Sequence, residues 1–299
     1  MINKYKNESK ILPKPAWIRV RINNDGHYRR IAEIIKKASL NTVCEEALCP
    51  NKCECWRHSR ATIMILGKTC TRACRFCNIS PSKTSVVDKD EPRRVAIAVK
   101  EIGLEDVVIT SVTRDDLPDG GAALWAETII RVKQAVPDII IEVLVPDFGG
   151  MTDAADLVIK TSPHVFGHNL ETVPSLYGSI RQNADYKRSL ALLKRASDYG
   201  LITKTSIMVG LGERDEEVVE VMNDAKEAGC DIFFIGQYLS PSLRHAAVKR
   251  YVPPDTFEKY KSIGLKMGFK VVISAPLVRS SFFSEEQRRY VTEKLKLKE

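Results

Sequence analysis

The feature that most constrains the fold is a regular alternation of short apolar runs with amphipathic stretches, which begins at residue 61. The apolar runs have the length of buried strands, and the stretches between them have the helical period of about 3.6 residues. Strands that alternate with helices pair in parallel through right-handed crossovers. The expected strands are Thr62–Leu66, Asp106–Thr110, Ile139–Val145, His164–Asn169, Thr203–Val209, Asp231–Tyr238 and, as a further short strand, Lys270–Ser274.

Helices fill the intervals, and several are followed by a glycine, which commonly ends a helix because it adopts left-handed backbone angles without strain. The six strand–helix units predict an α/β protein with a partial (β/α)6 barrel of the TIM type, shorter than the eight-fold kind. Residues 1–60 would form an N-terminal extension, 61–241 the barrel core, and 242–299 a segment that closes the barrel mouth. The expected helices are Tyr28–Ser39, Pro92–Ile102, Gly121–Ala135, Thr152–Lys160, Asp185–Tyr199, Asp215–Ala228 and Asp255–Lys266.

Charge is unevenly distributed along the 299 residues, whose net charge is +8. Residues 1–60 hold 13 Lys and Arg against 6 Asp and Glu, residues 61–241 hold 20 against 26, and residues 242–299 hold 13 against 6. Basic flanks are typical of proteins that bind nucleic acid or an acidic protein, although ordinary solvated surfaces give the same pattern.

Eight cysteines are present, and seven of them lie between Cys44 and Cys77. Such density would indicate a disulfide framework in a small secreted chain, but this chain opens with a polar, lysine-rich stretch rather than an apolar signal segment. No run approaches the roughly 18 apolar residues of a membrane span. We therefore expect a cytoplasmic protein with reduced thiols and no membrane partner.

Three of these cysteines, Cys70, Cys74 and Cys77, follow the first expected strand with spacings of x3 and x2. A loop after a strand holds such thiolates near one point, which suits an iron–sulfur cluster or zinc. A closed structural zinc site takes four protein ligands, whereas a site with an open position can bind a substrate. The first triad therefore favours a reactive metal centre, with a zinc knuckle completed by a distant residue as the alternative.

A second triad, Cys44, Cys49 and Cys55, precedes it in a loop-like stretch rich in Pro, Asn and Glu. Irregularly spaced cysteines in a loop again indicate a metal cluster. Zinc with Cys53 or His58 as fourth ligand is the alternative. Near the end of the chain, Ser280 and Ser281 would ordinarily cap a turn, but a serine could also supply a labile fourth ligand to the second triad.

In barrels of this kind, chemistry lies at the carboxyl ends of the strands. Glycine-rich turns there expose backbone amides to a ligand, although helix-entry turns have the same sequence. A polar side chain at a strand end could bind a ligand or belong to a satisfied network. The candidate cofactor-binding residues at these ends are Asp119, Gly120, Gly121, Asn169, Glu171, Gly210, Gly212 and Gln237.

The spacing of the first triad, with Phe76 before its third cysteine, resembles the signature of radical S-adenosylmethionine (SAM) enzymes. Over most of its length the chain further resembles lipoyl synthases. The motifs that carry this second resemblance are Leu40-Asn41-Thr42-Val43-Cys44 with Cys49 and Cys55, Met64-Ile65-Leu66-Gly67, Cys70-Thr71-Arg72, Arg114-Asp115-Asp116-Leu117-Pro118-Asp119-Gly120-Gly121, His168-Asn169-Leu170-Glu171-Thr172, Lys204 with Gly210-Leu211-Gly212-Glu213, Gly236-Gln237-Tyr238-Leu239, and Arg279-Ser280-Ser281-Phe282.

The resemblance implies a radical SAM barrel with two 4Fe-4S clusters. Cys70, Cys74 and Cys77 would hold the cluster that binds SAM, and Cys44, Cys49 and Cys55 with Ser281 would hold an auxiliary cluster. The implied reaction inserts sulfur at carbons 6 and 8 of an octanoyl-lysine on a carrier protein, with the auxiliary cluster as sulfur donor. The implied partners are lipoyl carrier domains (2-oxoacid dehydrogenase E2 subunits and the glycine cleavage H protein) and a low-potential donor such as ferredoxin or flavodoxin.

Two other interpretations remain open at this point. Another radical SAM sulfur-inserting enzyme, such as a biotin synthase or a tRNA methylthiotransferase, would share the first triad. A zinc-stabilised basic RNA-binding module would explain the cysteines and the charge without catalysis. The sequence shows no appended RNA-binding domain, so we expect no nucleic-acid partner.

The charge pattern leads to a hypothesis about docking. Both basic flanks contain proposed ligands of the auxiliary cluster, so the flanks would meet over one mouth of the barrel. A basic collar there, which includes Arg29, Lys36, Lys249 and Arg250, would attract an acidic octanoylated carrier domain.

Overall fold

The computed structural model describes residues 12–19, 26–82, 84 and 86–297. Its centre is an eight-stranded sheet in the order β1-β2-β5-β6-β7-β8-β9-β10, in which β1 is antiparallel to β2 and every later pair is parallel. The strands are β1 (Asn41–Thr42), β2 (Thr62–Ile65), β5 (Asp106–Ser111), β6 (Ile140–Leu144), β7 (Val165–Gly167), β8 (Ile202–Val209), β9 (Ile232–Gln237) and β10 (Val271–Ala275).

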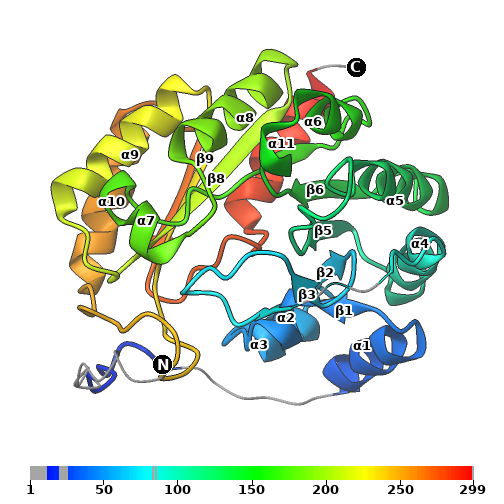
Figure 1. Cartoon of the computed structure of the whole chain (residues 1–299), viewed down its shortest axis with the longest axis horizontal. Helices are drawn as coiled ribbons and strands as arrows, with labels where there is room; N and C mark the ends of the chain where they lie inside the picture. Colours follow the sequence, from blue (N-terminus) through cyan, green and yellow to red (C-terminus); the bar gives the residue numbers. More distant parts are fainter. Residues whose placement is uncertain (1–11, 20–25, 83, 85, 298–299) are drawn as a thin grey trace.

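Helices cover the outer face of this curved sheet (Figure 1). The connecting helices are α4 (Glu91–Ile102), α5 (Ala122–Ala135), α6 (Thr152–Ile159), α8 (Tyr186–Asp198), α9 (Asp215–Glu227) and α10 (Pro254–Lys266). Alternation of parallel strands with outer helices confirms the predicted α/β partial barrel, and β10 adds a seventh parallel strand beside β9. None of the described helices is long and apolar enough to cross a membrane.

The sequence analysis missed the last helix, α11 (Glu285–Lys296), which covers the amino ends of the strands. Its Val291 packs with the first residues of β7, β8, β9 and β10. The missed signal is a capping pattern, because the hydroxyl of Ser284 accepts a hydrogen bond from the backbone N–H of Gln287. The helix buries little apolar surface, so its hydrophobic period is weak.

The N-terminal extension is more regular than the expected loop. It contains α1 (Gly26–Lys37), α2 (Val43–Glu46) and α3 (Lys52–Arg57), and α1 packs on α3 and α4. The ring of Tyr28 stacks at 5.2 Å, centroid to centroid, on that of the buried Trp56. The loop predicted around the second triad is therefore wrong, because Trp56 provides an apolar anchor that folds the stretch into two short helices.

The C-terminal segment between β10 and α11 meets the N-terminal extension. The side-chain amide of Asn51 donates to the carbonyl of Leu277 at 2.7 Å, and the hydroxyl of Thr62 donates to the carbonyl of Ser281 at 3.4 Å. The two flanks thus come together as expected. The division at residues 60 and 241 stays a prediction, although all three parts contribute strands to one sheet.

Candidate metal centres

The first triad lies in the loop that leaves the carboxyl end of β2. After Ile65 the chain turns at Leu66, passes through β3 (Thr69–Cys70), which pairs with β4 (Ser80–Pro81), and places Cys70, Cys74 and Cys77 in partly buried positions. This placement confirms that the triad follows the first barrel strand and opens at the carboxyl end of the sheet.

An unusual turn at Leu66 directs the chain into this loop. Leu66 has a φ of 67°, which is rare for a residue with a branched side chain. Its N–H donates to the carboxylate of Glu91 at 2.7 Å, and its carbonyl accepts from Arg114 at 3.4 Å. The Leu66 side chain lies against Gly121, where an added Cβ would approach Leu66 Cδ1 to 2.5 Å.

Arg72 ties the loop to two neighbouring strands. Its guanidinium donates to Asp115 after β5, at 2.8 and 2.9 Å, and to the buried Asp147 after β6, at 2.6 Å. Burial would raise the pKa of Asp147, but the hydrogen bond and charge of Arg72 outweigh it and lower that pKa to about 2. Arg188 adds a second cation at 3.2 Å. Asp147 therefore stays ionised and holds the loop in place.

Backbone contacts hold the other side of the loop. The N–H of Arg75 donates to the carbonyl of Ile180 at 2.8 Å, and the carbonyl of Arg75 accepts from Ala246 at 2.8 Å. His245 Nε2 lies 3.1 Å from the carbonyl oxygen of Cys77. The loop is thus held by four separate parts of the chain.

The thiols of this triad suit a metal-bound, anionic form. Burial raises the pKa of Cys74 to about 11 and that of Cys77 to about 12. Backbone N–H groups nevertheless point at sulfur, from Arg72 to Cys70 Sγ at 3.4 Å and from Ile79 to Cys77 Sγ at 3.5 Å. Buried thiols of this kind become thiolates when a bound cation compensates their charge.

Of the candidate cofactor residues, Asn169 and Glu171 lie beside the triad. Glu171 has a φ of 68° and accepts a hydrogen bond from Asn169 at 3.0 Å. Its charge contributes to raising the pKa of Cys74, whereas the buried Arg181 lowers it. Sequence reasoning missed Arg181, which lies beyond the strand end, just after α7 (Tyr177–Ile180).

The turn at Asp119, Gly120 and Gly121 serves its own helix. The Asp119 carboxylate accepts from the N–H of Gly121 at 2.9 Å and from that of Ala123 at 2.8 Å, which satisfies the free amides at the start of α5. Gly121 is required by the close approach of Leu66. These contacts explain the turn without a cofactor.

The other two glycine positions are also filled by protein groups. The Glu213 carboxylate accepts from the N–H groups of Gly210, Leu211 and Gly212 at 2.7, 2.9 and 3.1 Å. The amide of the fully buried Gln237 donates to three carbonyls and accepts from Val252. A Cβ on Gly210 would collide with that amide at 2.2 Å. These residues shape the carboxyl ends of β8 and β9 rather than present free donors.

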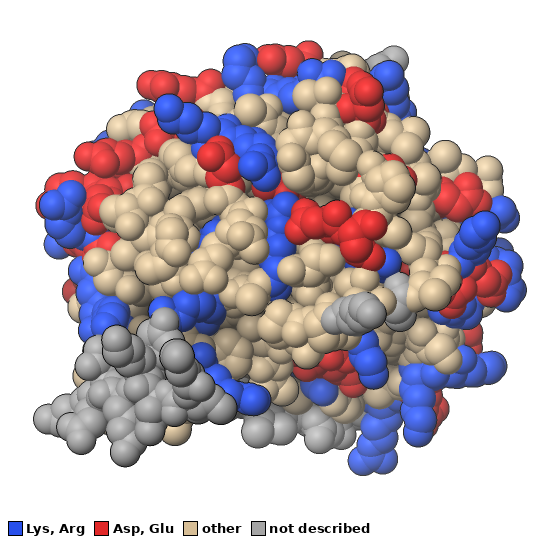
Figure 2. Space-filling model, viewed as in Figure 1, with Lys and Arg blue, Asp and Glu red and all other residues tan. Residues whose placement is uncertain are grey.

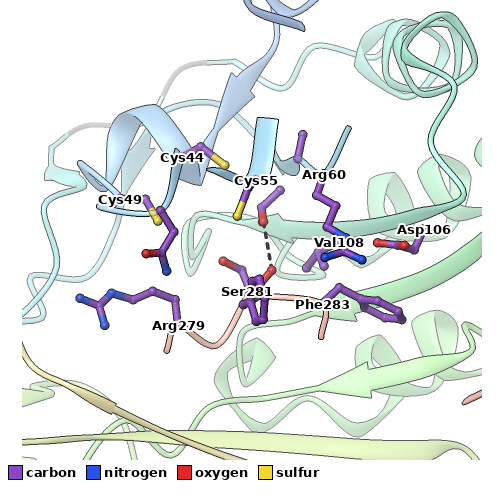
Figure 3. A pocket seen from close by; sticks show the side chains of 13 residues that line it. Cys44, Cys49, Cys55, Arg60, Asp106, Val108, Arg279, Ser281 and Phe283 are labelled. Carbon is purple, nitrogen blue, oxygen red and sulfur yellow. Dashed lines mark hydrogen bonds between the residues drawn. The ribbon is translucent and has the colours of Figure 1, made fainter. Parts of the chain in front are cut away.

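The second triad faces a separate cavity with about 430 Å³ of empty space, part of it open to solvent (Figure 3). Cys44, Cys49 and Cys55 lie along one side, and Ser281 lies across from them. The cavity is also lined by the first residues of β2 and β5, Thr62 and Asp106. The first triad therefore lies at the carboxyl ends of the strands, whereas this cavity lies at their amino ends.

The groups in this cavity influence one another electrostatically. Burial raises the pKa of Cys44 to about 11, and burial with the nearby Cys44 and Cys49 raises that of Cys55 to about 12. The half-buried Arg279 donates from its guanidinium to the carbonyls of Gln237 and Val278. Desolvation lowers its pKa, and the nearby Cys49 opposes that shift. The cavity thus combines three soft sulfur donors and two hydroxyls with two guanidiniums and one carboxylate.

Comparisons with known proteins agree on a family. The profile of the radical SAM superfamily matches residues 64–225. A lipoyl synthase of Caldanaerobacter subterraneus is 50% identical over 274 residues, which cover 91% of this chain and 96% of that protein. One of Rubrobacter xylanophilus is 50% identical over 276 residues, 92% of this chain and 86% of that protein. The chain belongs to the lipoyl synthase family.

Membership of the lipoyl synthase family makes the protein a radical SAM sulfurtransferase that uses SAM and a 4Fe-4S cluster. The two other interpretations, a different sulfur-inserting enzyme and an RNA-binding module, do not match this family. A crystal structure of Streptococcus suis SuiB bound to S-adenosylmethionine shares the fold, with a TM-score of 0.57 at 14% identity over 75% of this chain and 53% of that chain.

The donor sets fit the clusters expected of a lipoyl synthase. Within the described residues, no group of three His, Cys, Asp or Glu side chains converges on one point as a single metal ion requires. Cysteines on a four-iron cluster each bind a different iron, so they surround a cage. Cys53 and the buried Cys230 lie outside both sets, and Cys230 packs in the core as a small apolar residue.

Proposed function

We propose that the protein inserts two sulfur atoms, at carbons 6 and 8, into an octanoyl chain carried on a lysine of a carrier protein. The observation that carries this proposal is the meeting of Cys44, Cys49 and Cys55 with Ser281 in one cavity, although the serine lies more than 200 residues away in sequence.

Each triad has a separate role in the proposal. Cys70, Cys74 and Cys77 hold the cluster that binds SAM, and Cys44, Cys49, Cys55 and Ser281 hold the auxiliary cluster. When bound, the first cluster supplies the electron that cleaves SAM to a carbon radical, and the second supplies sulfur, because unactivated C–H bonds lie beyond acid–base chemistry. Ser281 acts as the exchangeable ligand, since a hard alkoxide suits iron less well than thiolate.

The residues around the first triad would position SAM. Asn169 and Glu171 present polar groups beside Cys74, and Arg181 supplies a buried cation next to them. Opposite charges at this site match the ammonium and carboxylate of SAM. Arg72 and Asp147 keep the loop in register with the strands.

The test is the anaerobic iron and sulfide content of the purified protein. We expect roughly eight irons per chain, as two four-iron clusters require, and a brown solution that cleaves SAM after reduction. Roughly four irons per chain would contradict the auxiliary cluster. Zinc in place of iron would contradict both proposed clusters.

The partners in this proposal are octanoylated lipoyl carrier domains, such as those of 2-oxoacid dehydrogenase E2 subunits and the glycine cleavage H protein. The electron would come from ferredoxin or flavodoxin in the cytoplasm.

The basic collar needs revision as a docking surface. The guanidinium of Arg250 binds Asp215 at 2.6 Å and Glu213 at 3.3 Å, so its charge is already matched within the chain. Over the face in Figure 2, Lys and Arg lie interspersed with Asp and Glu. Lys249, Arg29 and Lys36 are exposed and remain in the docking proposal.

A further inference from the structure

A polar groove lies directly behind the auxiliary cavity. It has about 740 Å³ of empty space, part of it open to solvent, and is lined by His58, Ser59, Glu105, Glu285 and Arg288 together with two residues that also line the cavity. Those two residues are Arg60 and Asp106. The cavity and the groove are therefore neighbouring spaces separated by two charged side chains.

Two ion pairs close this wall, and both involve α11. Arg60 follows α3, and its N–H donates to the carbonyl of Cys55 at 2.9 Å, while its guanidinium pairs with Glu285 in the first turn of α11. Arg288, one turn later, pairs with Asp106 and lies 2.9 Å from Glu105. In Figure 3, Arg60 and Asp106 lie together on one side of the cavity, away from Cys49 and Arg279.

The groove opens at the opposite end of the barrel from the first triad. Glu105 and Asp106 stand where β5 begins, and Gly103 of the groove ends α4. The first triad, by contrast, follows the carboxyl end of β2. An ion that moves through the groove would therefore not pass through the space beside the first triad, where SAM would bind.

The chemistry of the groove suits a small hydrated cation. Its three carboxylates, Glu105, Asp106 and Glu285, outnumber the two guanidiniums that pair with them, so the groove keeps a surplus of negative charge. With the imidazole of His58 they are oxygen and nitrogen donors, which ferrous iron accepts. Much of the rest of the cavity wall is apolar, from Ala61, Val108, Phe282 and Phe283. The polar side with Arg60 and Asp106 is the path of lower desolvation cost for an ion.

We propose that this groove is the route by which ferrous iron leaves the auxiliary site and by which iron and sulfide return to it, with the Arg60–Glu285 and Arg288–Asp106 pairs as its gate. The inference rests on the proposed function, because only a cluster that is consumed needs such traffic. Iron crosses as Fe²⁺ without a change of oxidation state, and Ser281 regains a proton from solvent when it leaves iron.

The experiment measures iron release in the full-length chain with Cys70, Cys74 and Cys77 replaced by Ala, so that the auxiliary site supplies all the cluster iron. The reconstituted protein is mixed anaerobically with a coloured ferrous chelator too large to enter the cavity, and the rate at which iron reaches solvent is followed. Glu285→Ala opens the gate from α11, and Arg60→Met opens it from α3. Glu286→Ala is the matched control, because Glu286 is the next residue of the same helix and pairs with Lys261 instead.

We expect Glu285→Ala and Arg60→Met each to release iron about two- to fivefold faster than the parent. A change of this size corresponds to the free energy that one partly exposed ion pair contributes. The double variant should be no faster than the faster single one, because both changes remove the same contact. Glu286→Ala should match the parent.

Equal release rates in the parent and all four variants would overturn the route. A parent protein without auxiliary iron would instead contradict the proposed function, and the route with it. Uptake supplies an independent reading: the gate variants should recover sulfide and iron faster than Glu286→Ala during reconstitution of the iron-free chain. Slower or equal recovery would overturn the return path.

Discussion

The two cysteine triads are built in opposite ways. Cys70, Cys74 and Cys77 lie within eight residues of one another, on a loop that Arg72 fixes to two neighbouring strands. The cavity of the second triad is assembled from both ends of the chain and includes Ser281 from the C-terminal segment. A rigid local loop suits a cluster that must survive every turnover. A site completed by a distant segment suits the proposed auxiliary cluster, whose serine ligand would leave and return.

A buried ion pair positions that distant segment. Lys204 in β8 donates to Glu142 in β6 at 2.8 and 3.0 Å, to Gln287 at 3.0 Å and to the carbonyl of Phe282 at 3.3 Å. Its ammonium also lies 4.1 Å from the centre of the Phe234 ring. The backbone next to Ser281 is therefore held to the barrel interior by the buried ammonium of Lys204. The loop of the first triad is instead held by Arg72 to residues that follow the strand ends.

The strongest test separates the triads by chemistry. Replacing Cys70, Cys74 or Cys77 with Ala should abolish SAM cleavage, because the open iron site is lost. Replacing Cys44, Cys49 or Cys55 should leave cleavage to 5′-deoxyadenosine and abolish sulfur insertion. Chromatography of deoxyadenosine and mass spectrometry of the carrier measure the two steps, and full sulfur insertion by Cys44→Ala would refute the donor role.

Lys204→Met should destabilise the chain by about 3–5 kcal/mol, because it leaves the fully buried Glu142 without its cation. Urea unfolding measures the loss. The double variant Lys204→Met with Glu142→Leu should regain most of the stability yet still insert sulfur poorly, since Phe282 loses its contact. Normal sulfur insertion by the double variant would show that Lys204 contributes only to the stability of the fold and not to the reaction.

The first triad should respond to acid through Asp147. Its pKa is lowered from 3.8 to about 2, so its contribution is complete above about pH 4 and is lost as pH falls through 2. That contribution is about 2 kcal/mol. Urea unfolding of the iron-free chain at about pH 5 and pH 3 should show a larger loss for the parent than for Asp147→Asn. Equal losses of unfolding free energy in the parent and in Asp147→Asn would show that the ionised Asp147 does not stabilise the loop.

Gly121→Ala should cost about 1–3 kcal/mol, because φ is 87° and the new Cβ would meet Leu66 at the entrance to the triad loop. Gly103→Ala is the control, since its φ is 78° and nothing lies within 4 Å of its added Cβ. The difference between the two variants isolates the clash. We also expect a changed electron paramagnetic resonance spectrum of the SAM cluster in Gly121→Ala but not in Gly103→Ala.

The smallest expected effect concerns docking of the carrier. Lys249→Glu, or Arg29→Glu with Lys36→Glu, should raise KM for the whole carrier domain by up to about fivefold, as exposed charges contribute little each. A short octanoyl-lysyl peptide should be unaffected. Arg250→Glu is not a clean test, because it would break contacts with Glu213 and Asp215. An unchanged KM in both variants and at high salt would contradict the docking role of the basic collar.

The sequence by itself determined the barrel and the first triad. Each expected strand and connecting helix is present, because buried strands and amphipathic helices reveal themselves through local periodicity. Cys70, Cys74 and Cys77 are neighbours in sequence, so their spacing alone shows that they can share a metal centre. The assignment of Cys44, Cys49, Cys55 and Ser281 needed the family resemblance, since nothing local links a serine to cysteines so far away.

Only the tertiary structure decided what the glycine turns and buried charges do. Gly121 and Gly210 look like ligand-binding turns in sequence, but their neighbours in space are Leu66 and Gln237. Lys204 and Glu142 sit in apolar strands without a local sign that they pair, and α11 has too thin an apolar stripe to be recognised. Contacts between distant segments leave no periodic pattern, because they are selected one pair at a time by packing and by the cost of burying charge.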